Sequence, residues 1–304
     1  MSSRRLPVLQ LAPVVAGARA PVVKLLALDT VWLQLTGTLC NLACLHCFIT
    51  CGPKEDRVPM MTADAVRRTL AEAAALGVRD YYFTGGEPML HPDFWTLCEA
   101  ALEVGPLTVL TNGTLIDDAA ADRAAALFTR SRYSFDLRIS LDGMTAAQND
   151  PVRGKGTHAQ ITAAVARLAA RGLSPNLTVV AHEEDMADPA ARLAFLAFVR
   201  TLGVQRPRVK FMPLLRIGRE PRRTRDYEVA ELDCLDGELA PAVGETLVCA
   251  SSRLVTAGGV YTCPILLDAP DARVGDTLAG AAEPIALRWA ACRTCVAEGL
   301  SCNT

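Results

Sequence analysis

The chain has 304 residues, of which 51% are hydrophobic and 21% are charged, which is enough apolar material for one large domain or for a large and a small one. Its 31 Lys and Arg residues against 33 Asp and Glu residues give a net charge of −2, so a nucleic-acid partner is not expected. The apolar stretch 11–28 is interrupted by Arg19, Lys24 and two prolines. It therefore predicts neither a membrane span nor a signal peptide, and we expect a cytoplasmic protein with no membrane partner.

Short apolar segments alternate with segments of helical periodicity from about residue 30 to residue 213. In one of the helical segments Thr62 can act as the N-cap, and Val66, Leu70 and Ala73 share one face. Repeated βα segments predict an α/β fold with a parallel sheet and outer helices, as a barrel or an open sheet. The expected strands, with the turns that follow them, cover 31–35, 80–88, 107–114, 135–143, 176–182 and 208–215, and the expected helices cover 62–77, 91–105, 117–128, 157–172 and 189–203.

Eleven cysteines are many for a cytoplasmic chain of this length. A reducing compartment disfavours disulfides, so clustered cysteines indicate metal binding or redox chemistry. After the first expected strand, CNLACLHC places Cys40, Cys44 and Cys47 at C-x₃-C-x₂-C spacing. Three thiolates leave one iron of a [4Fe–4S] cube open to a substrate or cofactor. The alternatives are a loop of reactive thiols, or zinc with Cys51 or His46 as fourth ligand.

Polar motifs follow two further strands, at the edge where ligand sites of parallel α/β folds lie. In TGGEP, Gly85 and Gly86 allow a ligand to approach the backbone, and Glu87 can accept hydrogen bonds from an ammonium group. In SLDG, Ser140 and Asp142 fall on the same side of a strand end and can bind ribose hydroxyls. An open iron, an ammonium-binding turn and a ribose site together predict S-adenosylmethionine (SAM) bound to an iron–sulfur cluster.

Over about residues 30–219 these motifs resemble those of the radical SAM superfamily, although His46 stands where an aromatic residue is commoner. PVRGKGTH resembles the Arg-Gly segment of many members, and Arg153 within it is placed to pair the SAM carboxylate or a substrate acid. KFMPLLRIGR resembles a late barrel segment of peptide-maturing members. The resemblance implies a partial (β/α)₆ TIM-like barrel and an electron donor such as flavodoxin or ferredoxin. It also implies reductive cleavage of SAM to methionine and a 5′-deoxyadenosyl radical that abstracts hydrogen from substrate.

A second group of cysteines lies near the end of the chain. LVTAGGVYTCP predicts a hairpin that presents Cys263, with Cys249 before it and the pair Cys292-x₂-Cys295 after it. A structural zinc site is the alternative, because such pairs commonly bind zinc. The pattern resembles the SPASM/twitch extension of radical SAM enzymes, in its one-cluster twitch version, which implies that these four cysteines hold an auxiliary Fe–S cluster. Cys302 either replaces one of them or is a free thiol.

We therefore expect an N-terminal extension (1–29), a radical SAM barrel (30–219), a linker (220–245) and a small cysteine-rich Fe–S domain (246–304). The extension is too short for a fused peptide-recognition domain. The expected function is radical SAM chemistry in peptide or protein maturation. The alternative enzymatic function is radical SAM oxidation or rearrangement of a small molecule such as a sugar, nucleoside or cofactor precursor. The non-enzymatic alternative is a two-cluster electron carrier. The sequence assigns no catalytic residue, and it predicts that Cys98 lies in the core and that the basic run 216–225 is solvated.

Overall fold

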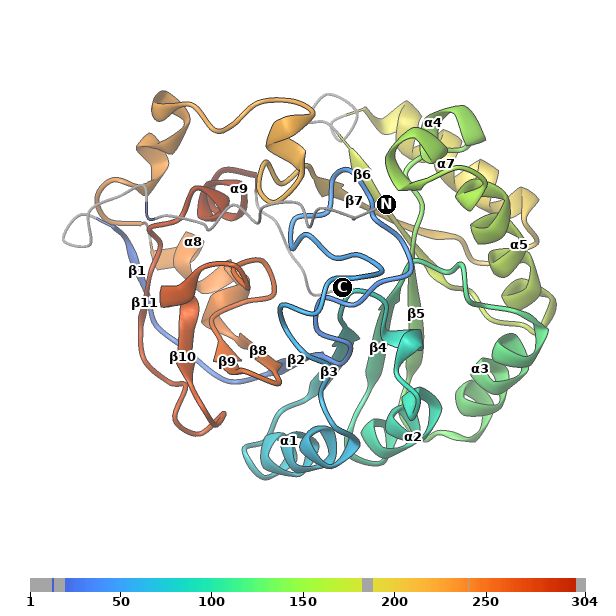
Figure 1. The fold of residues 1–304 in the computed structure, drawn as a ribbon, viewed down its shortest axis with the longest axis horizontal. Coiled ribbons are helices and arrows are strands. Elements are labelled where there is room, and N and C mark those ends of the chain that lie inside the picture. The colour runs from blue at the N-terminus through green and yellow to red at the C-terminus, as the bar shows by residue number, and fades with distance from the viewer. Residues whose placement is uncertain (1–12, 14–19, 182–187, 240, 299–304) are drawn as a thin grey trace.

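The computed structural model describes residues 13, 20–181, 188–239 and 241–298. This part of the chain forms a curved sheet of nine strands in the order β10-β9-β8-β2-β3-β4-β5-β6-β7 (Figure 1). The strands from β2 to β7 are parallel. These six are β2 (Thr30–Gln34), β3 (Asp80–Thr84), β4 (Leu107–Thr111), β5 (Phe135–Ser140), β6 (Asn176–Ala181) and β7 (Arg208–Pro213).

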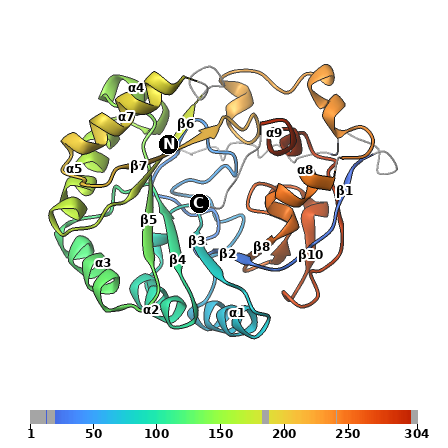
Figure 2. The same ribbon diagram turned by 180° about the vertical axis from the view of Figure 1, so that it is seen from behind.

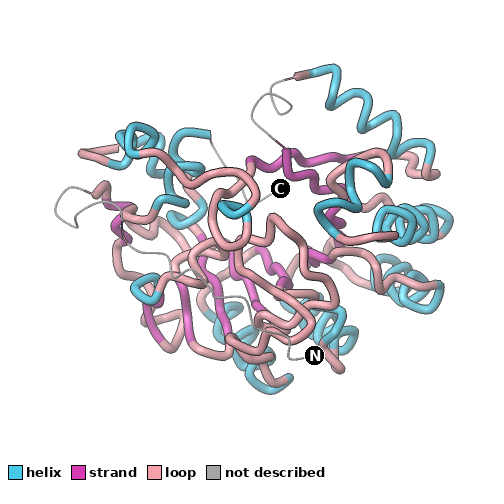
Figure 3. The backbone as a smooth tube through the Cα atoms, turned by 45° about the horizontal axis from the view of Figure 1, so that its top comes forward, coloured by secondary structure: helices cyan, strands magenta, loops and turns pink. Residues whose placement is uncertain are grey.

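Helices cover the outer side of this curved sheet (Figures 1 and 3). Because β7 forms one edge of the sheet and does not pair with β2 among the described strands, the barrel stays open. The expected α/β fold with a partial (β/α)₆ barrel is confirmed. The helices of the barrel are α1 (Ala63–Ala75), α2 (Phe94–Val104), α3 (Asp118–Arg130), α4 (Ala146–Arg153), α5 (Thr157–Ala170) and α7 (Pro189–Thr201).

Helix α1 forms as its sequence predicts. The Thr62 hydroxyl accepts a hydrogen bond from the Ala65 backbone N–H, which caps the first turn. Val66, Leu70 and Ala73 are buried against the sheet in one large apolar core. Cys98 on α2 lies in the same core and is fully buried, as expected.

Helix α2 begins three residues later than the sequence predicts. Pro88–Leu90 form a separate 3₁₀ turn, η1, and His91 is extended at φ −69° and ψ 127°. Pro92 disfavours a helical conformation of the residue before it, which explains why the helix does not start at His91. Helix α4, which the sequence analysis did not anticipate, follows β5 and carries a capping box formed by Thr145 and Gln148.

The C-terminal part of the chain continues the barrel sheet. Strand β8 (Ser252–Thr256) pairs in parallel with β2, and β9 (Gly259–Tyr261) and β10 (Arg273–Gly275) follow in antiparallel order. The expected hairpin before Cys263 is thus β8–β9. The remaining elements of this region are η4 (Val248–Ala250), η5 (Pro270–Ala272), β11 (Ile285–Ala286), α8 (Pro241–Thr246) and α9 (Ala290–Glu298).

Two earlier segments of the chain, one near the N-terminus and one directly after the barrel, lie against this C-terminal part (Figure 2). Strand β1 (Val22–Val23) pairs with β11. The stretch 220–245, expected to be a linker, carries the 3₁₀ turns η2 (Glu220–Arg222) and η3 (Val229–Leu235), and η3 packs on α9. Its side chains dock specifically: Leu235 is fully buried, and the Tyr227 and Thr294 hydroxyls lie 2.6 Å apart. No helix in the described ranges is long and apolar enough to cross a membrane.

Candidate active site

The carboxyl ends of the barrel strands surround a cavity of about 240 Å³. The loop that follows β2 and carries the first cysteines lies inside the curve of the sheet, in blue in Figure 1. The structure brings nearly all predicted barrel-site residues to this cavity. Its lining includes Cys40, Cys44, Cys47, Gly85, Gly86, Ser140 and Arg153.

Backbone contacts hold the cysteine loop against the TGGEP turn. The Gly86 N–H donates to the Gly37 carbonyl at 2.8 Å, and the Glu87 N–H donates to the Leu39 carbonyl at 3.0 Å. A Cβ at Gly86 would lie 2.1 Å from the Leu39 oxygen. Glycine is therefore required here by the close approach of two loops, in addition to any approach of a ligand.

The thiols of the cysteine loop differ in electrostatic environment. Burial raises the pKa of the Cys40 thiol to about 12. A hydrogen bond from the Cys51 thiol, together with the Cys51 N–H at 3.2 Å from the Cys47 sulfur, lowers the pKa of Cys47. The same contact raises the pKa of Cys51. The contact between Cys51 and Cys47 therefore shifts the two pKa values in opposite directions.

Glu87, expected to accept hydrogen bonds from an ammonium group, contacts neighbouring protein groups in this structure. Its side chain is fully buried, and Glu87 is not among the residues that line the cavity. One carboxylate oxygen accepts from the Thr111 hydroxyl at 2.7 Å and the Met89 N–H at 3.1 Å, and the other accepts from the Asn112 N–H at 2.7 Å. Burial raises the pKa of this carboxyl to about 7, although these hydrogen bonds oppose the shift. Glu87 thus ties the TGGEP turn to the end of β4.

Asp142 likewise lies outside the cavity lining, whereas Ser140 faces the cavity. An Asp142 carboxylate oxygen lies 2.7 Å from Arg153 Nε and 2.8 Å from His46 Nε2, and the other oxygen accepts from the Val180 N–H at 3.0 Å. The Asp142 and Arg153 side chains are only 5% and 6% exposed. In this structure Asp142, expected to bind a ribose hydroxyl, belongs to a buried ionic network that joins the cysteine loop to β5 and α4.

The segment after β7 contributes residues that the sequence analysis missed. Arg219, expected to be solvated, is buried, and its side chain donates to the Cys44 carbonyl at 3.2 Å. Its backbone N–H donates to the Cys47 carbonyl, also at 3.2 Å. Gly218 has a φ of +65°, and a Cβ there would lie 2.5 Å from the Cys47 oxygen. The glycine at this position was the available sequence signal, because it marks a close backbone approach.

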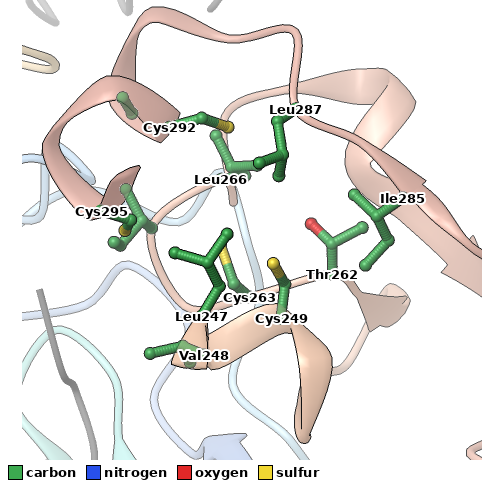
Figure 4. A pocket seen from close by; sticks show the side chains of 12 residues that line it. Leu247, Val248, Cys249, Thr262, Cys263, Leu266, Ile285, Leu287, Cys292 and Cys295 are labelled. Carbon is green, nitrogen blue, oxygen red and sulfur yellow. The ribbon is translucent and has the colours of Figure 1, made fainter. Parts of the chain in front are cut away.

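A second, small cavity lies in the C-terminal region, and all four predicted cysteines line it (Figure 4). Cys249 comes from η4 and Cys263 from the loop after β9, while Cys292 and Cys295 are three residues apart on α9. Cys302 lies outside the described residues. Among the residues that are described, no three His, Cys, Asp or Glu side chains converge tightly enough to hold a single metal ion.

The two cavities share one wall residue. Ile265 lines both of them, and Pro264 lines the barrel cavity directly after Cys263. The ion pair between Arg57 and Asp268 connects the same two regions, since Arg57 also donates to the Ile49 carbonyl at 2.8 Å. The C-terminal part therefore completes the wall of the barrel cavity.

The amino-acid sequence is similar to those of known maturases. A mycofactocin maturase, MftC, from Mycolicibacterium smegmatis is 30% identical over 253 residues, which are 75% of this chain and 62% of the relative. MftC from Mycobacterium ulcerans is 37% identical over 160 residues, or 51% of this chain and 41% of the relative. The chain thus spans less than two thirds of the length of these relatives.

The crystal structure of Streptococcus suis SuiB bound to the precursor peptide SuiA shares the fold, with a TM-score of 0.65 and 16% identity over 86% of this chain and 66% of that one. The family model for the radical SAM superfamily matches residues 35–196, a range that contains the cysteine loop and both strand-end motifs. Since this match spans more than half of the 304 residues, the chain belongs to the radical SAM superfamily.

Proposed function

We propose that this chain cleaves SAM reductively and abstracts hydrogen from a peptide substrate, as a peptide or protein maturase. One observation carries the proposal: the C-x₃-C-x₂-C thiols, the strand-end glycines and the C-terminal wall all face one cavity. The similarity to MftC, named a maturase, supports a peptide as the substrate class. The fold shared with SuiB, solved with a precursor peptide, is consistent with that class.

Cys40, Cys44 and Cys47 are suited to hold a [4Fe–4S] cluster, because three thiols on one loop line the cavity and soft thiolates are its usual ligands. When bound, such a cluster supplies the electron for cleavage of SAM to methionine and a 5′-deoxyadenosyl radical. Gly85, Gly86 and Ser140 line the same cavity and are the proposed SAM contacts. Arg153 is held in place by Asp142 and can orient a carboxylate of SAM or of the substrate.

Cys249, Cys263, Cys292 and Cys295 are the proposed ligands of an auxiliary Fe–S cluster. Their side chains surround a cavity and do not converge as ligands of one ion (Figure 4). A single zinc ion with Zn–S distances of about 2.3 Å would require sulfur atoms that converge closely. Zinc is the alternative, and the iron and zinc contents of the protein distinguish the two.

Flavodoxin or ferredoxin is the proposed electron donor, and a separate carrier protein or direct binding would deliver the peptide. A cytoplasmic location is proposed, because a reducing compartment would keep clustered cysteine thiols available for metal.

The test uses anaerobically reconstituted protein with SAM and dithionite, and Cys44→Ala as the matched control. We expect 5′-deoxyadenosine from the wild type and none from the control. If the protein were a two-cluster electron carrier, neither the wild type nor the Cys44→Ala variant would form 5′-deoxyadenosine. Adding the product of a small reading frame beside the gene should change the peptide's mass in step with 5′-deoxyadenosine formation. Turnover of sugars, nucleosides or cofactor precursors with no change in any such peptide would reject the peptide assignment and leave SAM cleavage standing.

A further inference from the structure

A fully buried arginine lies behind the C-terminal cysteine cavity. Arg253, on β8, has no exposed surface. Its guanidinium donates hydrogen bonds to the backbone carbonyls of Cys249, Ser252 and Ala281 at 2.8 Å each, and to that of Glu283 at 3.5 Å. Within the described part of the chain, all the groups that bind this guanidinium are carbonyls, and none is a carboxylate.

The carbonyl groups do not balance the charge of this guanidinium. They carry only partial charges, whereas a buried cation is stable only when opposite charge lies nearby. Burial lowers the pKa of Arg253, and the groups that oppose this shift are the thiols of Cys249 and Cys263. The charge of Arg253 therefore acts on two of the four cysteines of the C-terminal cavity.

The fold places this charge behind the wall of the cavity. Cys249, whose carbonyl the guanidinium binds, lines the cavity, whereas Arg253 does not (Figure 4). Strand β8 pairs with β9, which ends two residues before Cys263. The segment 281–283 that accepts from the guanidinium leads to Ile285, another lining residue. Arg253 thus connects segments that carry the cavity wall, and its charge is fixed beside the cysteines without entering the space between them.

We propose that Arg253 is the counter-charge of an anionic metal site formed by the thiolates of Cys249, Cys263, Cys292 and Cys295, and that it raises the reduction potential of a cluster held there. The inference rests on the proposed function in one respect, that these four cysteines bind metal. Four thiolates leave a net negative charge on an Fe–S core and on a single Zn²⁺ alike. Reduction of a cluster by one electron adds negative charge, so a fixed cation nearby favours the reduced form. Arg253 is a positioning residue that acts through its charge.

Redox titration of the reconstituted full-length protein with dithionite, followed by electron paramagnetic resonance, tests the inference. The wild type should show two reduction steps, and the step of the auxiliary cluster is the one that persists in Cys44→Ala. In Arg253→Gln the equilibrium constant for this step should fall at least about tenfold, a shift of about 59 mV to lower potential for one electron, while the other step stays in place. Arg253→Lys keeps the charge and should keep the wild-type potential. Arg273→Gln, at a partly exposed arginine on β10, should also keep it.

The inference is overturned if Arg253→Gln moves neither step, or moves both steps equally. If Arg253→Gln does not fold, Arg253→Lys decides, because lysine keeps the charge but lacks the planar set of donors that binds the carbonyls. A folded lysine variant with the wild-type potential supports the inference. A lysine variant that also fails to fold, or that folds with a lowered potential, shows that the carbonyl contacts are what matters and overturns it.

Iron and zinc contents of the same samples separate this inference from the proposed function. If the wild type holds zinc in place of the auxiliary cluster, the cluster assignment fails while the counter-charge is still tested. Arg253→Gln should then bind zinc at least about tenfold more weakly in competition with a chelator, because the anionic site has lost its counter-charge. Equal zinc affinity of the two proteins overturns the inference, and a wild type with neither metal at these cysteines overturns both.

Discussion

Replacing Asp142 with Asn should destabilise the folded protein strongly, because it leaves Arg153 buried beside a neutral amide. The two charged groups lie 2.7 Å apart with side chains 5% and 6% exposed. At this distance the Coulomb attraction is about 6 kcal/mol for an effective dielectric constant of about 20. Much of that attraction only offsets the cost of burying the charges, but removing one partner of a buried pair costs about 3–5 kcal/mol. We expect a loss of stability in that range.

The measurement is the free energy of unfolding in urea under anaerobic conditions. Asp276→Asn is the matched control, because Asp276 pairs with Arg273 at the surface and its side chain is 84% exposed. The control should lose at most about 1 kcal/mol. If Asp142→Asn loses no more than the control, the pair does not contribute as the structure indicates.

The pH dependence gives a second check on the same pair. Burial acts to raise the pKa of Asp142, but the charge of Arg153 and the contact with His46 outweigh it and hold the pKa below its usual range. The stability supplied by a carboxyl with a lowered pKa is fully present above the unfolded value of about 3.9 and is lost as the pH falls below it. The difference between wild type and Asp142→Asn should therefore shrink below about pH 4. An equal difference at pH 3 and pH 7 would refute this account.

Three further results are expected. Reconstituted wild type should contain about eight irons per chain, and alanine at all three cysteines of the 40–47 motif should leave about half; about four irons with one zinc in the wild type would reject the auxiliary cluster. Gly86→Ala should cost about 1–3 kcal/mol or more, because its Cβ would meet the Leu39 carbonyl. Gly244→Ala, where the added carbon meets open space, should be neutral or slightly stabilising, and equal thermal stability of the two variants would contradict the clash. Replacing Cys263 and Cys295 together by Ala should abolish substrate turnover but keep slow formation of 5′-deoxyadenosine under dithionite. Loss of that product while the barrel cluster remains intact would show that the C-terminal part supports the SAM site directly.

Local sequence determined the elements and the position of the site. Apolar periodicity and helix caps such as Thr62 depend only on residues close together in the chain, and they are enough to predict the βα units. Parallel strands then bring their carboxyl ends to one edge of the sheet. The spacing of Cys40, Cys44 and Cys47 is also local, so their shared position on one loop followed directly. Two local features were misjudged. Helix α2 starts later than expected, because Pro92 acts on the residue before it, and helix α4 was not anticipated.

Tertiary structure decided which groups the site residues contact. Glu87 and Asp142 carry the charge that a ligand contact requires, yet the structure turns one toward the end of β4 and the other toward Arg153 and His46. Arg138 lies beside Tyr82, and Ile265 lies between two cavities. Both positions depend on how strands that are distant in the sequence pair with each other. Sequence spacing sets the face on which a side chain lies. Its partners come from segments far along the chain, and a buried ion pair forms only after those segments have packed.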